Sequence, residues 1–502
     1  MEVGLKKTEF HCFDTIFSQK IKKEVSQDMV VPDTMPDIAE VLDVSGIFVI
    51  RSKEMAREGV RVTGNLPVHI LYKAEESGEI CLLEMSIPVD VLAEAILPDE
   101  SGRCSAMLQL LSVDARALNP RKVMVRAEVS AQIECFAETL MQLAEDVQEA
   151  TAGVYTQTKK ISFAPITSVE EKTFVLTDEL VLPAANAAAG ELLSKDLYAM
   201  VEEVKTLGSK LIFKGTLFTK LIYRSMDGLP AVAEFSTSFS QIMECDTAFV
   251  NGTADIHILP TGVYWELPAG GDGRTVHLEA HMLAQATAND CSEIFYISDA
   301  YSNLHPLELH RNDMVIPVTR QCLCLKESLR EVFDLPITLT DILNTRISCG
   351  EAVKQEAGFE LPLCVHVLGK SASGELCAVK KKSKMIFRTE LAKEDKIKTM
   401  RAAVREVHAV CMGSSLELRL MAELCYELVQ EKACAMVHSV QQDELIRDIS
   451  QLPSVVMLRA NQNCDLWPIA KEHCSSVQLI REVNALSGDE TWEKFLLIPK
   501  CR

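Results

Sequence analysis

Apolar and polar residues alternate along most of this chain, and the alternation has a period of two. Between residues 60 and 72, one parity carries mainly Val, Leu, Ile and Tyr, while the other carries residues such as Arg, Thr, Asn and Lys. The same pattern is clearest at residues 123–135, 276–284 and 416–428. Because successive side chains of a strand point to opposite faces, this pattern predicts long, half-buried strands in antiparallel sheets.

The alternating stretch also recurs at long range. Residues 64–72 reappear as residues 215–223, with a glycine and a tyrosine eight positions apart in both, and a weaker version occupies residues 359–369. An aliphatic–proline pair and an acid followed by two aliphatic residues recur three times, at spacings of 150 to 153 residues. These landmarks are Pro32, Pro183 and Pro336, and Glu40, Glu191 and Asp341. Self-similarity at a fixed period predicts repeated domains.

We therefore expect a mainly β fold with three tandem antiparallel β-sandwich or open-barrel repeats. Their predicted bounds are residues 1–145, 146–300 and 301–445. A short helix or two is expected near each proline landmark. The segment at residues 138–158 is rich in Ala, Gln and Glu, which favours a helix connecting the first two repeats.

Glycine and register add two finer expectations. Gly64 and Gly215 lie in the middle of predicted strands, where glycine marks a bulge or a close backbone approach, and a packing role is the favoured interpretation. In the third repeat, parity aligns Val367 with Tyr72, whereas turn spacing aligns Leu368 with Tyr72. A slip of one residue would exchange the buried and exposed faces, so we expect the parity to decide.

Composition narrows the classes of partner and compartment. The 502 residues carry 51 basic and 72 acidic side chains, and the net charge of −21 argues against nucleic acid or an anionic membrane as the main partner. No apolar run approaches the roughly 20 residues of a membrane-spanning helix, and the first residues lack the apolar core of a secretory signal. The 17 cysteines are scattered without a Cys-x-x-Cys pair. These observations predict a cytoplasmic protein.

The candidate chemical motifs are weak. Cys12 follows His11, and Cys322 lies two residues before Cys324, but neither pair has a second ligand pair at metal spacing, so free thiols are favoured over zinc. His408 and Cys411 lack a nearby orienting acid. The chain has no nucleophile elbow, phosphate-binding loop or dinucleotide-binding spacing. We expect no catalytic residue, no metal and no cofactor.

A basic strip interrupts the acidic chain between residues 380 and 398. It contains Arg388 and seven lysines, namely Lys380, Lys381, Lys382, Lys384, Lys393, Lys396 and Lys398. A solvated strand face is the favoured interpretation. The alternative is a surface that binds an acidic partner.

The pattern changes after about residue 440. A short aliphatic strand at residues 455–458 precedes Asp465, which is suited to cap a helix, and Pro468 falls within the first turn, where a missing N–H is tolerated. Ser475 or Ser476 can cap a second helix, and residues 495–499 form a closing strand. This pattern predicts a small α+β domain with strand–helix–helix–strand order at residues 450–502.

This tail resembles a LysM domain. The matching residues are Leu466-Trp467-x-Ile469-Ala470-Lys471, Asn484-x-Leu486 and Leu497-Ile498-Pro499. The resemblance implies a groove that holds N-acetylglucosamine sugars in some members and has a Gly-Asp-Thr sequence in its loop. Here Asn463, Cys464 and Asp465 stand in that loop, which argues for a retained fold and against sugar binding. The candidate groove residues are Asn463, Cys464, Asp465, Leu466, Trp467, Asn484, Ala485 and Leu486.

The rest of the chain resembles SPOCS domains of sporulation proteins. The resemblance rests on the run Pro32-Asp33-Thr34-Met35-Pro36-Asp37-Ile38-Ala39-Glu40-Val41-Leu42 and on the hairpin that begins at Gly64. SPOCS repeats that end in a LysM domain are typical of the SipL-like spore-coat morphogenetic proteins of clostridia. This implies a non-enzymatic scaffold, made in the mother cell and located at the forespore surface, whose LysM domain docks a SpoIVA-like coat ATPase.

A second class of function stays open at this point. The tail could instead bind glycans and recognise N-acetylglucosamine of peptidoglycan or of the spore cortex through the same groove. Capture of a protein partner that depends on the tail would favour the scaffold. Retention of the tail on purified peptidoglycan would favour the glycan-binding protein.

Overall fold

The computed structural model describes residues 2–97, 102–148, 153–448, 450–459, 465–486 and 495–501. Within these residues the fold is mainly β, with several antiparallel sheets and two short helices, which confirms the predicted fold class in outline. The helices expected among the repeats are absent from the described residues. Within the segment predicted as a connecting helix, residues 138–147 form the end of β7 (Lys122–Val147) and residues 154–158 form the start of β8 (Val154–Phe163), while residues 149–152 lie outside the described residues. The part in β7 is a strand because its side chains alternate between core and surface.

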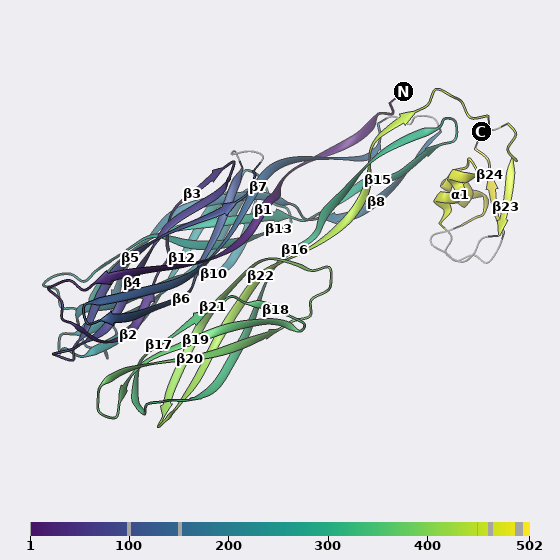
Figure 1. Cartoon of the computed structure of the whole chain (residues 1–502). Helices are drawn as coiled ribbons and strands as arrows, with labels where there is room; N and C mark the ends of the chain where they lie inside the picture. Colours follow the sequence, from purple (N-terminus) through teal and green to yellow (C-terminus); the bar gives the residue numbers. More distant parts are fainter. Residues whose placement is uncertain are drawn as a thin grey trace.

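The first lobe (residues 5–147) is a sandwich of two sheets around one core (Figure 1). Its strands are β1 (Leu5–Val30), β2 (Ile38–Gly46), β3 (Val49–Ala56), β4 (Gly59–Ala74), β5 (Ile80–Glu94), β6 (Arg103–Asn119) and β7 (Lys122–Val147). β7 lies between β1 and β6, and β4 pairs with β2, β3 and β5. The predicted inward residues of β4 and β7 are almost all completely buried.

The second lobe (residues 154–302) repeats this order of strand pairing. Its strands are β8 (Val154–Phe163), β9 (Ile166–Val181), β10 (Ala189–Leu207), β11 (Lys210–Ser225), β12 (Pro230–Glu244), β13 (Gly252–Glu266), β14 (Thr275–Asp290) and β15 (Ser292–Ser302). β14 lies between β9 and β13, and β11 lies between β10 and β12. β8 and β15 form a separate ladder.

The third lobe (residues 307–442) is built in the same way. Its strands are β16 (Leu307–Asp334), β17 (Leu339–Cys349), β18 (Val353–Gln355), β19 (Gly358–Ser371), β20 (Leu376–Arg388), β21 (Lys396–Met412) and β22 (Ser415–Gln442). β22 lies between β16 and β21, while β19 pairs with β17, β18 and β20. The described members of its core cluster all come from this lobe.

The strand register corrects one alignment of the third lobe. The inward parity that ends at Val367 is confirmed by burial, since this residue is 2% exposed. Tyr72 lies opposite Val41, however, and the matching residue opposite Ile342 is Gly369, so both alignments from sequence were wrong. A shift of two residues keeps the same faces inward, which is why parity alone does not detect it.

The mid-strand glycines are explained by close packing. A Cβ on Gly64 would lie 2.6 Å from the ring of Phe48 and from a backbone oxygen, and a Cβ on Gly215 would lie 2.2 Å from the carbonyl oxygen of Met200. Both glycines face a register shift in the neighbouring strand. This confirms the packing interpretation.

The first and last strands of each lobe extend into a narrow projection, here called the stalk (residues 5–14, 138–147, 154–163, 292–302, 307–317 and 431–442) (Figure 1). Three antiparallel ladders, β1–β7, β8–β15 and β16–β22, meet there. Their shared core takes three buried residues from each lobe, namely Cys12, Met141, Leu143, Phe163, Ile294, Tyr296, Ile316, Cys434 and Met436.

The tail lies at the far end of the stalk (Figure 1). Its described elements are β23 (Val455–Arg459), α1 (Leu466–Glu472), α2 (Val477–Val483) and β24 (Phe495–Pro499). β23 pairs antiparallel with β24. The helices cover the inner face of this two-stranded sheet, and the tail's buried core is Leu466, Ala470, Ile480, Leu496 and Ile498.

Candidate functional site

The helix caps of the tail follow from local sequence. The Asp465 carboxylate accepts a hydrogen bond from the backbone N–H of Trp467 at 3.0 Å, and Pro468 is the third residue of α1, which confirms both predictions. The two candidates for the second cap are resolved in favour of Ser476, whose hydroxyl accepts from the N–H of Leu479 at 3.1 Å. Ser475 instead donates its hydroxyl to the carbonyl oxygen of Pro499.

The predicted groove is only partly within the described residues. Asn463 and Cys464 lie outside the described residues, as do residues 487–494. Leu466 is 8% exposed and belongs to the core of the tail, so it supports the fold and does not face a ligand. Ala485 is exposed with φ at 50°, and Leu486 is half-buried against the same core.

Asn484 has a structural role in the tail. Its amide nitrogen donates to the carbonyl oxygen of Leu497 at 2.6 Å and to that of Ile480 at 2.8 Å, and its amide oxygen accepts from the N–H of Leu497 at 2.8 Å. The side chain therefore joins the end of α2 to β24. A polar group that is used in this way is a poor candidate for a sugar ligand.

Trp467 faces the stalk. Its indole N–H donates to Oδ2 of Asp299 on β15 at 2.8 Å, and the ammonium of Lys471 lies 2.7 Å from the same oxygen. Arg311 contacts the other carboxylate oxygen at 2.8 Å. Burial alone would raise the pKa of Asp299, but the hydrogen bonds from Lys471 and Trp467 outweigh burial and lower this pKa below its usual value.

Aromatic packing completes the contact between tail and stalk. The Tyr301 hydroxyl donates to the carbonyl oxygen of Ser475 at 2.9 Å, and its ring meets the Trp467 ring edge-on with centroids 4.8 Å apart. Tyr155 stacks on the other side of Tyr301 at 5.2 Å. The tail is thus attached through one patch of aromatic and charged groups.

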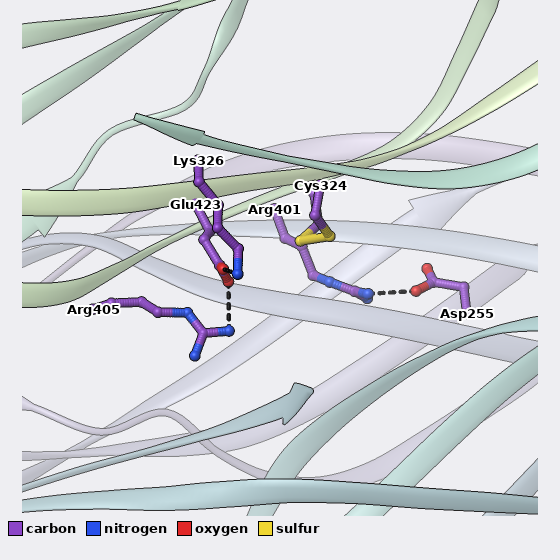
Figure 2. Close-up of a disulfide and its surroundings, with 7 residues drawn as sticks. Asp255, Cys324, Lys326, Arg401, Arg405 and Glu423 are labelled. Atoms are coloured by element: carbon purple, nitrogen blue, oxygen red, sulfur yellow. Dashed lines mark hydrogen bonds and ion pairs between the residues drawn. A yellow bond between two sulfur atoms is a disulfide. The ribbon is translucent and has the colours of Figure 1, made fainter. Parts of the chain in front are cut away.

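A second feature was not predicted from the sequence. A cavity of about 470 Å³ lies where the three lobes meet, and all three contribute residues to its lining. Two arginines of the third lobe line it and reach into the other lobes: Arg346 contacts Asp43 at 2.6 Å, and Arg401 pairs with Asp255. Figure 2 shows the second of these pairs beside Arg405, which contacts Glu423 at 2.6 Å.

The arginines around this cavity are paired with carboxylates, whereas burial raises the pKa of Asp196, which also lines the cavity. Burial would raise the pKa of Asp43 and of Asp255, but the adjacent arginines reverse the effect and hold both pKa values below their usual range. Burial lowers the pKa of His257 to about 4, which keeps this imidazole neutral near pH 7. We read the arrangement as a set of ion pairs that fix the third lobe against the other two.

One cysteine expectation needs correction. Cys324 was expected to carry a free thiol, but it forms a disulfide with Cys425 at the edge of the cavity (Figure 2). The two residues face each other on β16 and β22 with Cα atoms 4.0 Å apart, a juxtaposition that sequence spacing does not reveal. Cys12 is a buried thiol, and burial raises its pKa to about 11.

The other candidate motifs do not assemble a reactive centre. His408 and Cys411 are three residues apart on β21, so their side chains point to opposite faces. No group of three or more His, Cys, Asp or Glu suited to hold a metal ion occurs among the described residues.

Three lysines of the basic strip form ion pairs with acidic neighbours. Lys384 contacts Glu360 at 2.9 Å and Lys396 contacts Glu431 at 2.5 Å. Lys380 pairs with Asp114 of the first lobe. These pairs support the interpretation of a solvated face.

Comparisons with protein-family models, curated proteins and solved structures find no match to this chain. Within the described part of the chain, the helices are too short or too polar to cross a membrane.

Proposed function

We propose that this protein is a non-enzymatic scaffold in spore-coat assembly. In this proposal, three SPOCS-like β repeats form the framework, and a LysM-like tail docks a morphogenetic ATPase of the SpoIVA type at the forespore surface in the mother cell. The resemblance of the sequence to the SipL-like family names this system. The three lobes with the same order of strand pairing support the repeat interpretation.

One observation carries the proposal. The tail has its own apolar core and lies at the end of the stalk, remote from the three large lobe cores. Figure 1 shows this separation. A small unit that is joined to the end of the projection through Tyr301 and Tyr155 is well placed to bind a large partner without steric interference from the lobes.

The lobes provide support for the projection. The ion pairs of Arg346 and Arg401 join the third lobe to the others, and each lobe sends two strands into the stalk. A shared stalk core with contributions from all three lobes fixes the direction of the projection. This geometry suits a spacer with a terminal dock.

A capture experiment tests the proposal. We expect the full chain to retain a purified SpoIVA-like ATPase on beads, and removal of residues 450–502 to abolish capture. A charge-reversed variant at an exposed pair on the first lobe, Arg126→Glu, is the control and should capture normally. Undiminished capture by the truncated chain would refute the tail as the dock.

The same truncation distinguishes the scaffold from the glycan-binding alternative. Tail-dependent retention on purified peptidoglycan, without capture of the ATPase, would replace the scaffold proposal. Asn484 is unsuitable as a probe of the groove because its substitution damages the link between α2 and β24. Ala485→Asn is preferable, since this residue is exposed and asparagine tolerates its positive φ.

A further inference from the structure

The contact between tail and stalk consists of two complementary surfaces. On the tail, the indole N–H of Trp467, the ammonium of Lys471 and the carbonyl oxygen of Ser475 form what we call the stalk-facing patch. On β15, Asp299 and Tyr301 lie two residues apart and both reach this patch. A register shift between Ile297 and Asp299 precedes them. The bulge re-aims the strand, so that the residues after it face the tail.

We propose that the stalk-facing patch is a recognition site for an extended protein segment that carries an acidic residue and a tyrosine two positions later. β15 occupies the site within the chain, and a partner segment of the same chemistry displaces it. The proposal rests on the proposed function only in taking the tail as the docking module. The occupant is a protein strand, not a sugar.

The acidic position is specified by converging donors. Trp467 and Lys471 are four residues apart on α1 and therefore share one helix face. Both donors point to a single carboxylate oxygen, at 2.8 and 2.7 Å. An indole N–H cannot accept a hydrogen bond and an ammonium cannot either, so the site requires an acceptor and favours an anionic one.

The aromatic position is specified by a ring contact and a carbonyl. Tyr301 is 4% exposed, with its ring against Trp467 and its hydroxyl on the Ser475 carbonyl oxygen. Phenylalanine would leave this carbonyl with only the longer hydrogen bond from the Asn303 amide at 3.2 Å, and a smaller residue would leave the indole ring without its partner. The two positions of an extended strand that share one face are i and i+2, which matches the spacing of Asp299 and Tyr301.

The ion pair between β15 and the tail is partly open to solvent. Lys471 is 42% exposed and Asp299 is 17% exposed, so water and salt reach the ion pair. Five of the six buried residues in this core cluster belong to the tail, and Tyr301 is the one that the stalk contributes. The segment in the site is tethered to the tail, which gives it a high effective concentration and makes it a competitor of any partner.

A peptide assay tests this inference on the full chain. The probe is a fluorescent peptide with the sequence of residues 294–304, and its binding is measured by anisotropy. The wild-type chain should bind weakly because its own strand fills the site. Asp299→Lys places a cation against Lys471 and Arg311, releases the strand and should bind the peptide about tenfold more tightly, because the competent fraction rises. Asp299→Asn is a milder second variant with the same expected direction.

Control variants of the chain and a control peptide show whether the gain in affinity depends on the stalk-facing patch. Glu293→Lys has the same charge change on the same strand, at a residue paired with Lys160, and should leave peptide affinity at the wild-type value. Adding Trp467→Ala to Asp299→Lys should abolish the gain, as should a peptide with asparagine in place of its aspartate. Equal affinity for the wild type and Asp299→Lys, or a gain that survives Trp467→Ala, would overturn the proposal.

The assay is independent of the ATPase. Loss of ATPase capture on removal of the tail combined with no peptide binding would leave the scaffold standing and overturn only this recognition site. Peptide binding without ATPase capture would support the recognition site and overturn the scaffold proposal. The Asp299→Lys variant could also form a concentration-dependent dimer that the peptide dissociates. That result would identify β15 of a second copy as the occupant and refute the proposal of a different partner protein.

Discussion

Substitutions at the inter-lobe ion pair should reveal an asymmetry between its two members. Arg346 contacts Asp43 at 2.6 Å, and their side chains are 16% and 9% exposed. Asp196, on β10 of the second lobe, also acts on Arg346 and contributes to raising the pKa of this arginine. One arginine thus serves carboxylates from two other lobes, whereas Asp43 depends mainly on this arginine.

The expected magnitudes follow from the group left without a partner. Breaking a buried ion pair typically costs about 3–5 kcal/mol, because the remaining charge is uncompensated. Arg346→Met leaves the buried carboxylate of Asp43 without its cation, next to the half-buried Asp196, and should lower the free energy that holds the third lobe in place by about 4 kcal/mol. Asp43→Asn leaves an arginine that keeps Asp196, so a loss of about 2 kcal/mol is expected.

The pH dependence has a definite sign. The pKa of Asp43 is lowered by Arg346, so the pair stabilises the fold above the usual aspartate pKa, and this stabilisation is lost as pH falls through the lowered value. In Arg346→Met, burial without the cation should raise the pKa of the same carboxyl. The destabilisation of this variant should therefore be greatest near pH 7 and shrink below about pH 4.

Hydrogen exchange measured with increasing urea is the appropriate assay, because a protein of several lobes does not unfold in one step. Protection of β2 and β17 reports the interface between the first and third lobes. Arg320→Met is the matched control, since Arg320 pairs with Glu427 at 2.6 Å inside the third lobe with similar burial. It should destabilise β16 and β22 but leave β2 protected. An equal or larger effect of Asp43→Asn than of Arg346→Met would refute the reasoning.

Three smaller predictions concern local packing. Asn484→Ala should lower the stability of the tail by about 1–3 kcal/mol because the backbone C=O and N–H of Leu497 lose the Asn484 side chain as their partner, whereas Ala485→Asn should be nearly neutral by thermal unfolding. Gly64→Ala should destabilise the first lobe by about 1–3 kcal/mol, because its Cβ would approach Phe48 to 2.6 Å; Gly190→Ala, with 3.6 Å of room, is the control. Intact-mass measurement with and without reductant should show the Cys324–Cys425 disulfide, and an unchanged mass would contradict it.

Local patterns in the sequence predicted much of the local structure. The apolar positions that alternate at residues 123–135 form a face of β7 that is entirely buried. Successive side chains of a strand point to opposite faces, so burial of one face requires an apolar residue at every second position. The helix caps at Asp465 and Ser476 could be predicted from the sequence because a cap joins residues only two or three positions apart. Composition misled at residues 138–158, where alternating burial in long strands prevailed over helix propensity.

The contacts of the candidate site could not be predicted from local sequence. Trp467 was assigned to a groove by resemblance, but its indole meets Asp299, which is 168 residues away in the chain. Arg346 and Asp43 are 303 residues apart, and no local spacing signals such a pair. The repeats give a partial clue, because Ser45, Asp196 and Arg346 occupy the same position, five residues after the acid landmark, and two of the three are charged. A charged residue at an otherwise matching position in one repeat indicates a contact between repeats.

The central claim is that the tail docks the coat ATPase, and one equilibrium measurement tests it most directly. The dissociation constant of the purified SpoIVA-like ATPase is determined by biolayer interferometry for the full chain and for residues 1–449. The account predicts that removal of the tail weakens binding about 100-fold or more, equivalent to the loss of roughly 2.7 kcal/mol. The same dissociation constant for both chains would contradict it.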